Sequence, residues 1–147
     1  MNPRIISVCL ALFPTIAGAE NVVAGTMEIS DPVVRSTPAG AMAGAGYLTL
    51  RNTGTETEHL LAVEAEFPRV QIHGMEMTDG VAQMTPMETV EIPPGESVTF
   101  EPGGLHVMFM GLGGDPFEVG EDVPATLIFE TLGAVEVTFT VIDMSDH

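Results

Sequence analysis

Short segments in which hydrophobic and polar residues alternate cover most of the chain, and helical periodicity is weak. β-Branched residues are frequent in these segments, and clusters of Gly, Pro, Asn and Asp separate them, as is typical of strands and turns. The predicted strands span residues 27–30, 33–36, 45–52, 58–65, 69–75, 81–86, 97–101, 106–111, 125–130 and 136–142. About eight to ten short strands at this spacing predict an all-β fold, either an antiparallel sandwich or a Greek-key barrel.

Two of the predicted strands carry histidine and methionine on the face that a core does not need. In LHVMFM, the aliphatic and aromatic residues share one face because side chains alternate along a strand, which leaves His106 and Met108 on the other face. In RVQIHGM, valine and isoleucine face the core, and His73 and Met75 face away. Both segments therefore combine an ordinary packing face with a second face of a different chemistry.

The first twenty residues have the features of a secretory signal peptide. One arginine precedes an apolar run over residues 5–16, and the small residues Ala-Gly-Ala at 17–19 form a cleavage site. We therefore expect residues 1–19 to be removed on export to the periplasm, so that the mature chain begins at Glu20. No later segment is long and apolar enough to span a bilayer, so we expect no membrane insertion.

Cysteine content and charge exclude several function classes. The only cysteine, Cys9, lies inside the predicted signal peptide and far from its cleavage site, so we expect no lipid anchor, disulfide or thiolate chemistry in the mature protein. Removal of Arg4 with the signal changes the formal net charge from −17 to −18. Such a surface repels nucleic acids and anionic lipid headgroups, and it attracts cations and basic partners.

Histidine and methionine together form a neutral, soft ligand set. Thioether sulfur favours Cu(I), imidazole binds several metals including copper, and a thioether forms no disulfide in an oxidising compartment. The two segments therefore favour a site that holds and releases Cu(I), although a methionine on its own more often fills a gap in a core. His59 has no methionine near it and is interpreted as a surface or hydrogen-bonded residue, and the isolated Met27, Met42 and Met87 are interpreted as packing.

Two histidines and two methionines follow one another at distinctive spacings along the chain. His73 is followed by ten residues and Met84, Met84 by 21 residues and His106, and His106 by one residue and Met108. This H-x10-M-x21-H-x-M pattern, together with AGYLTLRNTG before it and IPPGESVTFEPGGLHVMFMGL around its end, resembles the periplasmic copper chaperones of the PCu(A)C family. The resemblance extends over residues 33–142.

The resemblance implies a cupredoxin-like Greek-key β-barrel or sandwich, over residues 20–142, that binds one Cu(I) per chain. Carried over by position, the ligands are His73, Met84, His106 and Met108. The family is implicated in delivering copper to the CuA-type site of cytochrome c oxidase subunit II, directly or through a thioredoxin-like copper chaperone. We therefore expect a monomer with these copper acceptors as its partners.

The chain departs from many members of the family at two positions and in its tail. Methionine and arginine are common in the family where Ala82 and Thr85 stand here. Many members also carry a His/Met-rich C-terminal extension that takes Cu(II), whereas residues 143–147 of this chain form only a short polar tail. Met144 and His147 are the donors there for a weak Cu(II) site, and we favour a frayed tail instead.

Several other functions use the same residues differently. A copper storage, buffering or resistance protein would share the ligands, whereas an electron-transfer cupredoxin needs a cysteine thiolate that the mature chain lacks. In a structural or adhesion domain the methionines would only pack, and substitution of His73 or His106 would leave metal binding unchanged. No Ser/His/Asp arrangement, phosphate loop or paired-carboxylate motif stands out, so we expect no enzyme. Met75, Met77 and Met110 are interpreted as an apolar collar around the site or as packing.

Overall fold

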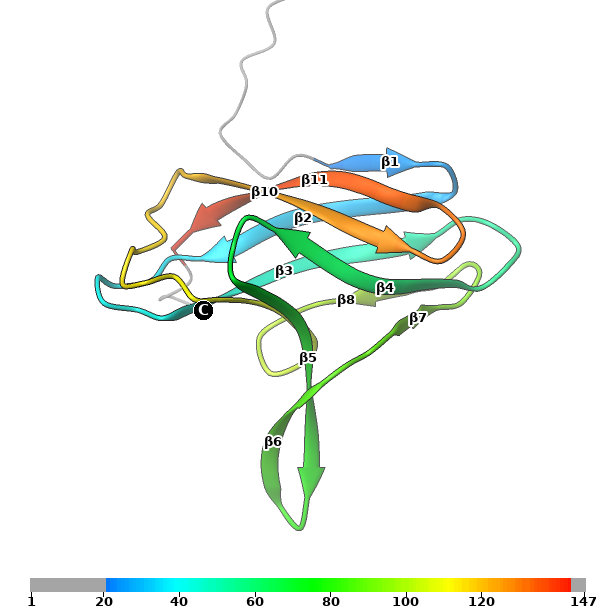
Figure 1. Cartoon of the computed structure of the whole chain (residues 1–147). Helices are drawn as coiled ribbons and strands as arrows, with labels where there is room; N and C mark the ends of the chain where they lie inside the picture. The colour runs from blue at the N-terminus through cyan, green and yellow to red at the C-terminus, as the bar shows by residue number, and fades with distance from the viewer. Residues whose placement is uncertain (1–20, 144–147) are drawn as a thin grey trace, which may run out of the picture.

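The computed structural model describes residues 21–143, and this part of the chain is all-β, which confirms the predicted fold class (Figure 1). Its strands are β1 (Val22–Ala24), β2 (Met27–Arg35), β3 (Ala43–Asn52), β4 (Glu58–Ala65), β5 (Arg69–Thr78), β6 (Val81–Pro86), β7 (Val90–Ile92), β8 (Ser97–Thr99), β9 (His106–Met110), β10 (Asp122–Phe129) and β11 (Gly133–Ile142). The predicted signal peptide, and Met144 and His147 of the predicted tail, lie outside the described residues. Among residues 21–143, no helix has the length and hydropathy to cross a membrane.

The strands form one curled sheet in the order β6-β5-β9-β3-β2-β11-β10-β4-β7, with β1 added to β2 and β8 to β3. Curling brings β4 against β5 and β7 against β3, so the sheet encloses one core as a sandwich (Figure 1). This arrangement agrees with the expected cupredoxin-like sandwich. It departs from a purely antiparallel arrangement because β2 and β11 pair in parallel.

Most strands begin and end within a few residues of their predicted limits. The two segments predicted at 27–30 and 33–36 are a single strand, β2, because a bulge interrupts the alternation without ending the ladder. At this bulge the register shifts between Ser30 and Val33, and Asp31 has a positive φ of 52°. Strands β1 and β7 are absent from the prediction because three residues are too few to show an alternating pattern.

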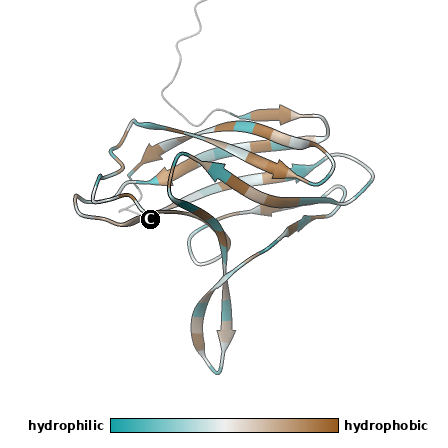
Figure 2. Ribbon diagram, viewed as in Figure 1, coloured by the Kyte–Doolittle hydropathy of each residue, from teal (hydrophilic) through white to brown (hydrophobic). Residues whose placement is uncertain are grey.

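The core fixes the orientation of β9. Phe109 is fully buried, and its ring contacts three other phenylalanine rings edge-on, with centroids 5.4–6.0 Å apart. Val107 is fully buried as well. Hydrophobic and hydrophilic segments alternate along the strands in Figure 2, as half-buried strands require. Since side chains alternate along β9, anchoring Val107 and Phe109 in the core turns His106 and Met108 to the opposite face.

The β5–β6 hairpin extends away from the sandwich as an arm (Figure 1). Its two strands join through Asp79 and Gly80, whose positive φ values of 53° and 80° are those of a two-residue type I′ turn. Strand β9 pairs only with the first half of β5, from Arg69 to His73. The rest of β5 pairs with β6 alone, and we call residues 74–85 the hairpin arm.

Candidate copper site

His73 and His106 lie side by side where β5 and β9 meet. They are directly opposite each other in the ladder, and their ring centroids are 5.8 Å apart with the rings inclined at 66°. A metal ion about 2 Å from a ring nitrogen lies about 3 Å from the centroid of that ring, so two imidazoles that share one ion have centroids within about 6 Å of each other. The observed spacing meets this limit.

One nitrogen of each ring is buried without a hydrogen-bond partner: Nδ1 of His73 and Nε2 of His106. The other nitrogen of His106, Nδ1, lies 3.0 Å from the carbonyl oxygen of Gly104 and donates its proton to it. Nε2 of the neutral ring therefore carries a lone pair. An unpaired buried polar atom costs about 1–3 kcal/mol of stability, so folding alone does not account for these two nitrogens.

The side-chain amide of Gln71 controls the tautomer of His73. One end of the amide lies 3.0 Å from His73 Nε2, and the other lies 3.0 and 2.8 Å from Nε and Nη2 of Arg69. A guanidinium offers only donors, so the carbonyl oxygen faces Arg69 and the NH2 group donates to His73 Nε2. The ring proton is then on Nδ1. If the amide turned over, Nε2–H would donate to Gln71, and Nδ1 would be free to bind a metal.

The surroundings of His73 lower its pKa below the ordinary value of 6.5. Burial is the main cause, because it disfavours the charged imidazolium. The positive charges of His106, when protonated, and of Arg69 lower the pKa further. The His73 ring therefore stays neutral, as a metal ligand must be, at a more acidic pH than an exposed histidine does.

Thioethers line a cavity beside His106. Met75, Met84, Met108 and His106 line one cavity of about 540 Å³, and residues of β2, β3 and the loop before β9 complete its wall. Met108 is half-buried, whereas Met84 is 60% exposed on the hairpin arm, directly opposite Met75. The structure thus brings three of the four predicted ligands to one cavity and packs the fourth, His73, against His106.

The remaining methionines differ in their surroundings. Met77 is 70% exposed near the end of the hairpin arm, and Met110 is half-buried at the end of β9. Met27 is fully buried, as predicted for a packing residue. Met42 is 62% exposed in the segment before β3, so its predicted packing role is wrong.

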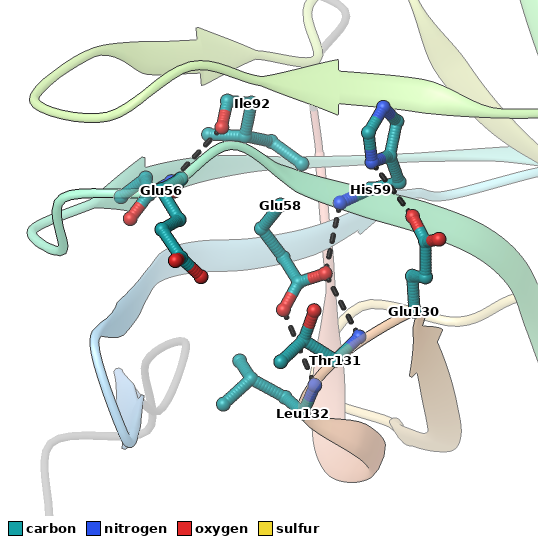
Figure 3. Close-up of polar contacts among 8 residues, drawn as sticks. Glu56, Glu58, His59, Ile92, Glu130, Thr131 and Leu132 are labelled. Atoms are coloured by element: carbon teal, nitrogen blue, oxygen red, sulfur yellow. Dashed lines mark hydrogen bonds and ion pairs between the residues drawn. The ribbon is translucent and has the colours of Figure 1, made fainter.

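His59 lies on β4 and forms an ion pair with Glu130, with 2.8 Å between Nδ1 and Oε2, which confirms that it is a hydrogen-bonded surface residue (Figure 3). Beside it, the buried carboxylate of Glu58 accepts hydrogen bonds from the backbone N–H groups of His59, Thr131 and Leu132, at 2.9–3.2 Å. These bonds hold the β10–β11 turn against β4. The polar cluster is therefore a structural one.

The donors favour a soft metal ion over a hard one. Within residues 21–143, no three His, Cys, Asp or Glu side chains lie close enough together to hold a metal ion. Structural zinc and calcium sites draw their ligands from such groups. Two imidazoles with several thioethers form instead a neutral set that suits Cu(I).

Two polar groups of the site are missing from the sequence-based prediction. Gln71 lies two residues before His73 and so shares its face of the strand, a signal that the sequence does carry. The carbonyl group of Gly104 has no side-chain signature at all. Metal-binding histidines commonly have such hydrogen-bond partners on the second nitrogen, where they fix the orientation and tautomer of the ring.

Solved structures with this fold extend over most of the chain. The structure described as the apo PCuAC domain from PmoF1 has a TM-score of 0.71 and 26% identity, covering 84% of this chain and 99% of that one. The copper-bound PCuAC domain from PmoF2 has a TM-score of 0.70 and 26% identity, covering 84% and 98%. The solution structure of apo-DR1885 from Deinococcus radiodurans has a TM-score of 0.64 and 25% identity, covering 92% and 91%.

Sequence comparison identifies a family. The chain is 28% identical over 139 residues to the protein named "Putative lipoprotein Lxx21020" of Leifsonia xyli subsp. xyli, which covers 93% of this chain and 82% of that relative. The profile of the family described as "Putative lipoprotein LpqE-like" matches residues 27–141, from the start of β2 almost to the end of β11. The chain therefore belongs to the LpqE-like family.

Proposed function

We propose that this protein is a copper chaperone that binds one Cu(I) per chain through His73, Met84, His106 and Met108. The observation that carries the proposal is the pair of buried imidazole nitrogens without partners, at the edge of a cavity lined by thioethers. The likeness to a copper-bound PCuAC domain supports the same metal. Copper is the cargo here, and the residues serve binding and transfer.

The exposure of the site favours delivery over storage. Met84 is 60% exposed and lies on an arm that only β5 and β6 form, so an incoming ligand reaches the metal without unfolding the sandwich. Thiolates of an acceptor carry charge and bind Cu(I) strongly, so they displace neutral thioethers one at a time through an intermediate in which both proteins share the metal. The acceptor we propose is the CuA-type site of cytochrome c oxidase subunit II, reached directly or through a thioredoxin-like copper chaperone.

We also propose that the protein acts in the periplasm. Residues 1–19 have the composition of a signal peptide, and the names of its relatives as lipoproteins support an envelope location. A site built from thioethers suits an oxidising compartment, because it contains no thiol that could form a disulfide. The acidic surface suits a basic docking patch on the acceptor.

A Cu(I) titration of residues 20–147, under reductant and with a chromogenic competitor, tests the function. The variants are His106→Ala and Met84→Ala, and His59→Ala is the matched control because that histidine lies in the ion pair with Glu130. We expect one tight equivalent that excess Zn(II) does not displace, with affinity lower by at least about tenfold, or about 1.4 kcal/mol, in His106→Ala, lower by a smaller factor in Met84→Ala and unchanged in the control. Equal affinity in all four proteins, or displacement by Zn(II), would contradict the proposal.

A further inference from the structure

Met75 occupies the position between the histidine pair and Met84. Strand β5 lies between β6 and β9, and Met75 is directly opposite Met84 in the β5–β6 ladder. Met84 is therefore two strands away from His106 and two residues further along the ladder, about 11–12 Å in a flat sheet. Met75 is on the adjacent strand, two residues beyond the direct partner of His106, and such diagonal neighbours are about 7–8 Å apart. By register, Met75 is closer to His106 than the predicted ligand Met84 is.

The side chain of Met75 also points in the required direction. It shares a face of β5 with His73, because the two residues are two positions apart. It lines the same cavity as Met84, His106 and Met108. The ladder between β5 and β9 ends at His106, so strand β9 does not continue alongside Met75.

Packing does not account for Met75. The residue is half-buried and lies outside the hydrophobic core that the described residues form. Its nearest partner across the hairpin, Met84, is itself 60% exposed, so the pair contributes little burial of apolar surface. A thioether in this position is more useful as a donor than as a core residue.

We propose that Met75 is a further Cu(I) ligand that exchanges with Met84 during transfer, an inference that rests on the proposed copper function. With Cu(I) held by His73, His106 and Met108, the fourth position is taken by either thioether. Exchange breaks the bond from copper to the sulfur of Met84 as the bond to the sulfur of Met75 forms. The metal remains Cu(I), and no proton or electron is transferred. The side chain of Met84 then turns away, which gives the acceptor access to the metal while copper keeps four ligands.

The exchange predicts a specific pattern of affinities. Each of Met75→Leu and Met84→Leu should lower Cu(I) affinity by less than about tenfold, because the remaining thioether replaces the lost one. The Cu(I) affinity of the double variant should fall by at least about a hundredfold. This is more than the product of the two single effects, because the effects of coupled residues are not additive. Leucine preserves the shape and hydrophobicity of the side chain, and Met42→Leu is the matched control because Met42 is exposed and lies outside the cavity.

Methyl NMR of the protein labelled with 13C at the methionine methyl groups tests the contact directly. The probe is Cu(I) alone at one equivalent under reductant, and the methionine-to-leucine variants assign the signals. We expect the methyl signals of Met75, Met84 and Met108 to shift, and that of Met42 to stay in place. In Met84→Leu, one equivalent of Cu(I) should still bind, with a larger shift of the Met75 signal.

Two results separate the possible failures. If the Met84 and Met108 signals shift while the Met75 signal is silent in both the wild type and Met84→Leu, the exchange is overturned and the copper function stands. If none of the three signals shifts, the copper function and the exchange are both overturned. An affinity of the double variant equal to that of Met84→Leu would also overturn the exchange.

Discussion

Replacement of His106 by leucine should abolish tight copper binding and leave the metal-free protein at least as stable as the wild type. His106 is 5% exposed, and its Nε2 is buried without a partner, at a cost of about 1–3 kcal/mol. Leucine removes that atom and fills a similar volume. The variant also loses the hydrogen bond from Nδ1 to Gly104, worth about 0.5–1.5 kcal/mol. The net change is a stabilisation of about 0–2 kcal/mol.

Urea unfolding of the metal-free protein with a chelator present measures this change. Far-UV circular dichroism is the suitable signal, because the chain has no tryptophan and one tyrosine. His59→Leu is the control, since that histidine is half-exposed and forms only a surface ion pair. One equivalent of Cu(I) should raise the thermal midpoint of the wild type and of the control, because a ligand that binds only the folded state stabilises it, and should leave His106→Leu unchanged.

The reasoning fails if His106→Leu destabilises the metal-free protein by more than about 1 kcal/mol, the worth of one ordinary hydrogen bond. That result would mean that the ring of His106 contributes to folding, and that its Nε2 has a partner in solution. Copper-dependent stabilisation of His106→Leu equal to that of the wild type would contradict the assignment of His106 as a ligand.

The structure makes three further predictions. Gln71→Glu should raise Cu(I) affinity by about tenfold, because a carboxylate accepts from both Arg69 and Nε2–H of His73 and so frees Nδ1; equal affinities in a competitor titration would refute this. Since the folded state lowers the pKa of His73 below its ordinary value of 6.5, the unfolded state takes up this proton first as the pH drops. The free energy of unfolding should therefore be highest above pH 6.5 and decrease as the pH falls below it. Urea unfolding should show a weaker pH dependence for His73→Leu, and an unchanged dependence would contradict the cause given. Glu58→Leu should lower the free energy of unfolding by about 2–4 kcal/mol in the same assay, because three backbone N–H groups lose their acceptor. Cu(I) affinity should not change. A loss below about 1 kcal/mol would contradict the role of Glu58 in holding the β10–β11 turn against β4.

The fold was largely predictable because most of its strands bury one face. Alternation along β4 and β6 reproduces their limits, 58–65 and 81–86, and the turn at Asp79 and Gly80 is evident from composition. The parallel pairing of β2 with β11 is not visible in the sequence, because it joins segments about a hundred residues apart and depends on the packing of the whole sheet. A three-residue strand such as β7 has too few positions to establish a period.

The site was predictable only in part. A single strand pattern places His106 and Met108 on one face, so the sequence alone was sufficient for this pair. Whether His73 is opposite His106 depends on the register between β5 and β9, which is a long-range property. By the same register, Met75 is closer to the histidines than Met84 is. The spacing of these residues along the chain does not show this difference. The assignment of the four ligands stays a prediction until copper is bound.

Copper K-edge X-ray absorption of the protein loaded with one equivalent of Cu(I) is the most direct measurement of the ligand set. The account predicts a Cu(I) edge and a first shell of two imidazole nitrogens with two thioether sulfurs, and no such shell in His106→Leu. A shell of nitrogen and oxygen atoms without sulfur, or a spectrum that His106→Leu leaves unchanged, would contradict it.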